Sequence, residues 1–185
     1  MENVASRWDN YEPKNGSQQK LVNALIELSN VPDGQLAGII ALGTAGVGKT
    51  HLAVAYAKAI LQAGGTAKYI NSSSASSAER MSIINSDIPD VLIVDDFNAP
   101  YVGTYDSAKN LRETVLRMYD NGGRIFITSN FADYSEFLKN LLRSPMGLNE
   151  AERTRIIDRI GSAFLPLMAE GESNRQANSW FGNWC

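Results

Sequence analysis

The sequence lacks the features that mark secreted and membrane proteins. Its only cysteine, Cys185, is the last of 185 residues, so no internal disulfide can form and the chain suits a reducing cytoplasm. No apolar run approaches the ~18 residues of a membrane span. The polar start Met1-Glu-Asn-Val is no signal peptide. We therefore expect a cytoplasmic protein that does not enter a membrane.

The chain also lacks an excess of charge of either sign. Its 17 Lys and Arg residues stand against 20 Asp and Glu, giving a net charge of −3. No global basic field therefore indicates nucleic-acid binding, although a local path for DNA stays open. The length suffices for one α/β core, and no repeat or linker divides it. We expect one domain over residues 1–185, with an N-terminal segment at 1–16 and a tail at 176–185.

The most informative feature present is a complete G-x-x-x-x-G-K-[ST] motif between an apolar run at 36–42 and a helical pattern. This strand–loop–helix context is what a phosphate-binding loop requires. Its glycines let backbone N–H groups point at phosphate oxygens, and the helix start adds a positive end. Lys49 is expected to reach the β- and γ-phosphates, and Thr50 to coordinate Mg²⁺. The motif predicts ATP binding by Gly43, Thr44, Ala45, Gly46, Val47, Gly48, Lys49, Thr50 and the following His51.

An acidic pair ends the buried-type strand at 91–94. Ligands of open α/β sheets bind at the carboxyl ends of strands, so this strand would deliver Asp95 to the phosphate loop. We expect Asp95 to hold Mg²⁺ through water and Asp96 to orient or deprotonate the attacking water. The alternative is an exposed turn that happens to be acidic.

A second apolar strand, at 125–128, also ends in polar residues. We expect Asn130 beyond it to hydrogen-bond the γ-phosphate and the lytic water. An ordinary strand-end turn is the alternative.

Asn149 with Glu152 three residues later resembles a capping box that opens a helix, and this helix carries Arg153, Arg155 and Arg159. Arg155 and Arg159 are four residues apart and share a face. Such a face is often only solvated, but Arg159 could also complete a neighbouring subunit's nucleotide site as an arginine finger. Arg175 is a further candidate for sensing phosphate.

Strand and helix patterns alternate along the chain, which predicts an α/β fold with a mainly parallel sheet and helices on both faces. The expected strands are 36–42, 67–70, 91–94, 125–128 and 163–168. The expected helices begin near 17, 51, 105 and 149.

The ordered motifs resemble the ATPase core of DnaC-type and IstB-type proteins, the helicase loaders and transposition helpers of the AAA+ class. The resemblance covers residues 8–177 and rests on segments 8–19, 43–52, 92–97, 118–122, 127–130, 158–160 and 171–175. It implies a three-layer P-loop fold with a five-stranded sheet, and residues 8–19 closing over adenine. It also implies that Asn130 is sensor 1, Arg159 the finger that acts in trans, and Arg175 a sensor-2-like arginine. Because the chain ends soon after Arg175, we expect the full C-terminal helical lid to be absent.

The leading functional hypothesis is an ATPase that forms ATP-dependent homo-oligomers and acts in DNA replication or transposition. Its expected partners are single-stranded DNA and a replicative helicase or transposase. Asp96 stands where stronger AAA+ hydrolases carry glutamate, so an interaction module with little hydrolysis is the alternative. A small-molecule kinase is a weaker one, because no arginine-rich lid insert follows the acidic strand.

Overall fold

The computed structural model describes residues 13–32, 35–72, 87–98, 105–144 and 147–171. The helices are α1 Gly16–Ser29, α2 Lys49–Gln62, α4 Tyr105–Asn121, α5 Tyr134–Leu141 and α6 Glu150–Ala163. The strands are β1 Leu36–Leu42, β2 Ala67–Asn71, β3 Val91–Asp95, β4 Gly123–Thr128 and β5 Phe164–Met168. Within these ranges, no helix is long and apolar enough to span a lipid bilayer.

The five strands form one sheet in the order β2-β3-β4-β1-β5, and every neighbouring pair is parallel. This confirms the predicted α/β fold and sharpens "mainly parallel" to parallel throughout. All five carboxyl ends therefore lie at one edge of the sheet, where the polar residues predicted for the site follow β1, β3 and β4.

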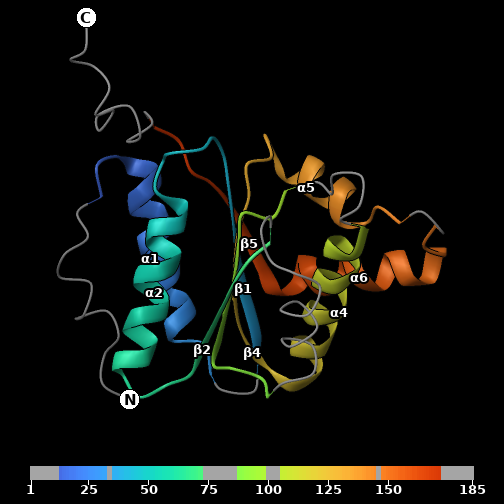
Figure 1. Ribbon diagram of the computed structural model, residues 1–185, viewed down its shortest axis with the longest axis horizontal. Helices are drawn as coiled ribbons and strands as arrows, with labels where there is room; N and C mark the ends of the chain where they lie inside the picture. The colour runs from blue at the N-terminus through green and yellow to red at the C-terminus, as the bar shows by residue number, and fades with distance from the viewer. Residues whose placement is uncertain (1–12, 33–34, 73–86, 99–104, 145–146, 172–185) are drawn as a thin grey trace, which may run out of the picture.

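Helices cover the sheet on both faces (Figure 1). Side chains of α1 and α2 pack on one face, around Tyr56 and Phe126. Side chains of α4, α5 and α6 pack on the other, around Phe97 and Phe137. The central strands β3 and β4 are buried on both faces, which explains their unbroken apolar sequences.

Among the described residues, β5 is an edge strand that pairs with β1. That position is compatible with Pro166, because a proline has no N–H to donate and is tolerated on an edge strand, where one side makes no hydrogen bonds to a neighbour. The sequence prediction of a fifth strand at 163–168 is confirmed.

α5 was not among the helices expected from the sequence. It has only eight residues, and its signals are the N-cap Asp133, whose Oδ1 accepts from the Glu136 N–H at 2.8 Å, and a buried pair, Phe137 and Leu141. So short a helix depends on packing against its neighbours more than on its own sequence.

Arg124 joins β4 to the end of α1. Its buried guanidinium donates from Nε to the Leu28 carbonyl at 3.0 Å and from Nη2 to the Val31 carbonyl at 2.7 Å. These carbonyls lie at the negative end of α1, which favours a cation. Arg124 therefore ties the end of α1 to the sheet through two hydrogen bonds from a charged side chain.

Candidate nucleotide site

The phosphate-loop segment connects β1 to α2 through three glycines with left-handed backbone angles. The φ values are 126° at Gly43, 89° at Gly46 and 98° at Gly48, which is the N-cap of α2. At Gly43 a Cβ would also lie 2.2 Å from the Ala169 carbonyl oxygen, just beyond β5. Only glycine fits there, on both backbone and steric grounds.

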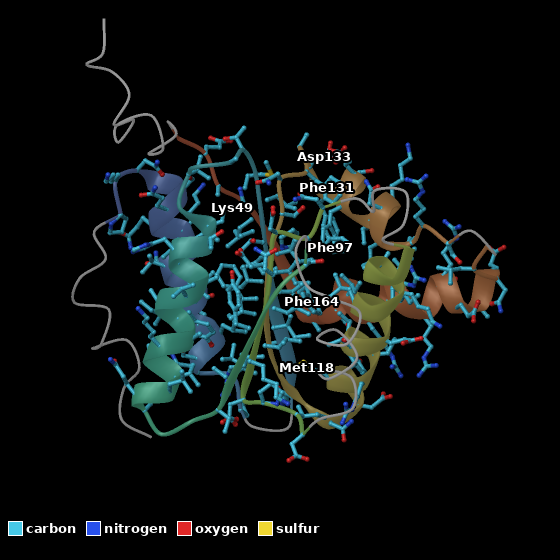
Figure 2. All side chains as sticks on the ribbon, in the orientation of Figure 1. Lys49, Phe97, Met118, Phe131, Asp133 and Phe164 are labelled. Atoms are coloured by element: carbon cyan, nitrogen blue, oxygen red, sulfur yellow. The ribbon has the colours of Figure 1, made fainter. Side chains whose placement is uncertain are left out.

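Lys49 is folded back into this loop. Its Nζ donates to the carbonyls of Gly43 at 2.6 Å and Thr44 at 2.7 Å, and to Asn130 Oδ1 at 3.0 Å. The residue is only 6% exposed. Figure 2 shows Lys49 toward the same end of the sheet as Phe131 and Asp133, which follow β4.

Asp95 ends β3 and is also buried. Its Oδ1 accepts from the Thr50 hydroxyl at 2.9 Å and from the Thr128 hydroxyl at 2.6 Å. Its Oδ2 accepts from the Tyr69 hydroxyl at 2.7 Å. The first turn of α2, β4 and β2 thus each supply a donor to one carboxylate, which offsets the cost of burying its charge.

Asp96 adopts a left-handed backbone with φ of 55°, the only such non-glycine residue in the described ranges. Its N–H donates to the Thr128 hydroxyl at 2.9 Å, and its Oδ1 accepts from Asn98 at 2.6 Å and Asn130 at 3.0 Å. Strained backbone of this kind persists where the surroundings fix it, and it concentrates at functional sites.

Asn130 therefore bridges the loop lysine and the acidic strand. Its Oδ1 faces Lys49 and its Nδ2 faces Asp96. The structure brings together the four side chains that the sequence predicted for phosphate and metal chemistry: Lys49, Thr50, Asp95 and Asp96, with Asn130 between them.

The start of α1 also reaches this site. The buried Gln18 donates from Nε2 to the Val47 carbonyl in the loop at 3.0 Å. The side chains of Asn15 and Ser17 donate to the Glu170 carbonyl beyond β5, at 3.0 and 2.9 Å. Of the segment 8–19 expected to close over adenine, residues 13–19 are described, and Gln18 among them contacts the phosphate loop.

Within its own chain, Arg159 does not contact the candidate nucleotide site in the described ranges. Its guanidinium pairs with Asp120 at 3.0 Å and lies 4.7 Å from the centre of the Tyr119 ring, both on the last turn of α4. Arg155 approaches Asp120 at 4.0 Å. Met118, one residue before Tyr119, lies toward the end of the sheet opposite Lys49 (Figure 2).

The remaining predicted residues are either exposed or lie outside the described residues. His51 is exposed on the first turn of α2, and Arg153 is exposed near the start of α6. Arg175 and the tail at 176–185 lie outside the described residues, as do residues 1–12 and any C-terminal lid beyond 171.

Two contributors to the site were missed by sequence reasoning. Thr128 and Tyr69 both hydrogen-bond Asp95, yet sequence reasoning assigned a role to neither, although Thr128 lies in the segment 127–130. Tyr69 pairs in register with Ile93, two residues before Asp95, and so shares its face of the sheet, a relation that no local sequence pattern reveals.

Comparisons with known proteins agree with this geometry. A family model described as IstB-like ATP binding protein matches residues 4–179. Among solved structures, DnaI is similar with a TM-score of 0.68 and 19% identity, over 95% of this chain and 94% of that one. The DnaC helicase loader gives 0.63 and 19%, over 92% and 100%. The replication initiator DnaA, bound to AMPPCP and single-stranded DNA, gives 0.60 and 17%, over 90% and 50%.

At these identities the structural likeness establishes the fold, that of AAA+ P-loop cores. A search of curated protein sequences finds no match. The family model, in contrast, spans nearly the whole chain. The chain therefore belongs to the IstB-like ATP binding protein family.

Proposed function

We propose that this protein is a cytoplasmic, Mg²⁺-dependent ATPase whose single AAA+ domain oligomerises through nucleotide-bridged interfaces and acts in DNA replication or transposition. The observation that carries the proposal is the connection between the phosphate loop and the acidic strand. Thr50 contacts Asp95 at 2.9 Å, and Asn130 links Lys49 to Asp96. Nucleotide, metal and water chemistry would thus meet at one edge of the sheet.

Lys49 and the glycine-rich loop are the proposed phosphate ligands. The loop N–H groups and the start of α2 would face the phosphates, and the Lys49 ammonium would neutralise the β- and γ-phosphate charge. Gln18 fixes the Val47 carbonyl in the middle of this loop, which supports a role for the segment before α1 in shaping the nucleotide pocket.

The donor set fits Mg²⁺. Thr50 and Asp95 present a hydroxyl and a carboxylate oxygen 2.9 Å apart. In the described ranges no group of three or more His, Cys, Asp or Glu side chains could hold a metal alone. One carboxylate together with substrate phosphates is the usual way in which proteins bind Mg²⁺. When bound there, the ion would neutralise charge that develops on the phosphates.

Asp96 is the proposed base for water, with Asn130 holding it in place. Its carboxylate accepts amide donors from Asn98 and Asn130, which fix its position. Aspartate is one methylene shorter than the glutamate of stronger AAA+ hydrolases, so we expect slow hydrolysis. This is also the one observation that favours the second candidate, an ATP-controlled interaction module with little turnover.

Arg159 is proposed to serve a neighbouring subunit. It is held beside Asp120, directly before β4 begins, whereas Asn130 follows the end of that strand. Six residues of strand separate the two ends, or about 20 Å at the usual rise. This distance supports action in trans, because the side chain cannot span it within its own chain.

Single-stranded DNA and a replicative helicase or transposase are the proposed partners. The related DnaA structure contains single-stranded DNA. A shallow depression of about 380 Å³ between α5 and α6 is lined by Lys139, Arg143 and Arg153, among others. These cations supply a local path for phosphates on a chain of net charge −3.

The proposal is tested by measuring the oligomeric state of the protein with different nucleotides and with or without Mg²⁺. Sedimentation of the protein with ATP and Mg²⁺ should show oligomers that ADP or metal removal disperses, accompanied by release of phosphate. Assembly without turnover would favour the interaction module. A monomer that transfers the γ-phosphate to a small molecule would contradict both candidates and indicate a kinase.

A further inference from the structure

Tyr69 places its hydroxyl on the carboxylate proposed to serve the metal. It lies on the edge strand β2, in register with Ile93 of β3, while Asn71 is in register with Asp95. The side chains at 69 and 95 therefore point to the same face, that of α2. The Tyr69 hydroxyl donates to Asp95 Oδ2 at 2.7 Å.

This contact divides the two carboxylate oxygens between different neighbours. Oδ1 accepts from Thr50 and Thr128, whereas Oδ2 accepts from Tyr69. Thr50 and Thr128 alone would leave the carboxylate free to turn about its last bond. A donor on the second oxygen fixes the plane of the group and therefore the direction in which Oδ1 faces Thr50.

The rest of Tyr69 does not explain why a hydroxyl is present. The residue is 47% exposed, and phenylalanine would fill the same place on the edge strand. The hydroxyl faces a carboxylate oxygen, which can only accept, so it acts as the donor in this contact.

We infer that Tyr69 is a positioning residue for Asp95, orienting its carboxylate for the Mg²⁺ that accompanies ATP. This role rests on the proposed function, in which Asp95 serves the metal. Tyr69 touches neither nucleotide nor metal in this account and acts only through Asp95. Loss of its hydroxyl should weaken the metal-dependent part of ATP binding and leave the metal-independent part intact.

The test is a Mg²⁺ titration of ATP binding by Tyr69→Phe, followed with a fluorescent ATP derivative. The half-saturating Mg²⁺ concentration should rise by about tenfold, the factor expected for a lost hydrogen bond to a charged group. Affinity in EDTA and the melting temperature should match the wild type. Tyr134→Phe, which removes a hydroxyl from a tyrosine stacked on Phe137, is the matched control and should bind Mg²⁺ and ATP unchanged.

The outcomes are distinguishable. If Tyr69→Phe titrates like the wild type, the positioning role is overturned while the metal site stands. If Tyr69→Phe loses affinity equally in EDTA and in Mg²⁺, the hydroxyl has a structural role and the inference is likewise overturned. If Asp95→Asn titrates like the wild type, the proposed metal site itself fails.

Discussion

Lys49 makes contacts that stabilise the fold and is also the proposed phosphate ligand. From the motif alone this lysine belongs to an exposed loop, but the structure buries it against two loop carbonyls and Asn130. We predict that Lys49→Ala abolishes tight ATP binding. We also predict that it lowers the free energy of unfolding by about 1–3 kcal/mol, because those buried acceptors lose their donor.

Equilibrium ATP binding and urea unfolding measure the two effects together. Lys58→Ala is the matched control, since Lys58 is an exposed lysine on the same helix. It should change neither quantity. Normal ATP affinity in a folded Lys49→Ala protein would refute the phosphate-loop assignment.

Asp95 and Asp96 should separate in their effects although they are adjacent. Asp95→Asn should weaken Mg²⁺-dependent ATP binding, because Asp95 accepts from the Thr50 hydroxyl and is the proposed metal ligand. Asp96→Asn should bind ATP normally and lower turnover by ~10²-fold if Asp96 is the base. Asparagine tolerates the left-handed backbone at position 96, so this variant changes charge without adding strain.

Binding affinity and phosphate release, measured separately for each variant, decide the assignment. Equal loss of affinity in both would mean that the roles of the two aspartates are assigned wrongly.

At the scale of residues, the sequence predicts what motifs encode and misses what folding brings together. The spacing within 43–50 and the acidic end of β3 predict Lys49 and Asp95 as site residues without a structure, and the structure places both at the carboxyl ends of the strands. The hydroxyls of Tyr69 and Thr128 reach Asp95 only because β2 and β4 flank β3 in the sheet. Strand order is a tertiary property, so neither contact is written in a local pattern.

At the scale of elements, α6 is the helix whose start is best defined. Asn149 accepts from the Glu152 N–H at 2.9 Å, and Glu152 returns a bond from its Oε2 to the Asn149 N–H at 3.1 Å. The sequence predicted this capping box, and the structure confirms it. We predict that Asn149→Ala destabilises the protein by about 1 kcal/mol.

Thermal unfolding measures this effect, and a domain of this size should melt about 2–4 °C lower. Asn23→Ala provides the control, because Asn23 is exposed on α1 away from a cap. ATP binding should stay normal in Asn149→Ala, because Arg159, the residue of α6 that we assign to the nucleotide site, is proposed to affect hydrolysis and not binding. An unchanged melting temperature would show that the box adds nothing to stability.

The other elements differ in how much the sequence could say about them. The positions of the strands and of the longer helices could be predicted to within a few residues, because long apolar runs alternate with amphipathic patterns along the sequence. α5 escaped because eight residues carry too little periodicity, and its burial comes from Phe97 and Phe131, whose rings lie 5.5 and 6.4 Å from that of Phe137. In the sequence, Arg124 is only a polar residue at the start of a strand. Its burial and its hydrogen bond to the end of α1 follow from the way α1 packs on the sheet.

At the scale of the whole molecule, the net charge of −3 leads us to expect that only assembled subunits bind DNA. A single chain carries −3, so several copies of the depression at Lys139, Arg143 and Arg153 should be needed. We predict that binding of single-stranded DNA requires ATP and weakens steeply with salt, because phosphate contacts release counterions.

Fluorescence anisotropy over a salt series checks this, with and without ATP. Arg143→Ala should lower the affinity and the salt slope, whereas Lys20→Ala, an exposed lysine on α1, should not. Tight binding by the monomer that does not change with salt would contradict the prediction.

The central claim is that the ATPase site is shared between subunits, and Arg159 tests it most directly. Arg159→Ala should bind ATP normally, but its rate of hydrolysis should fall by up to ~10³-fold where the basal rate is high enough to show it. Lys49→Ala should not bind ATP but keeps its arginine. Phosphate release is therefore measured for each variant alone and for an equimolar mixture, with folding and mixed oligomers verified.

In the mixture, the intact arginine of a Lys49→Ala subunit can face the intact phosphate loop of an Arg159→Ala subunit. The account predicts partial recovery of hydrolysis above the sum of the two variants alone. No recovery, with mixed oligomers present, would contradict the account and confine Arg159 to its contacts with Asp120 and Tyr119.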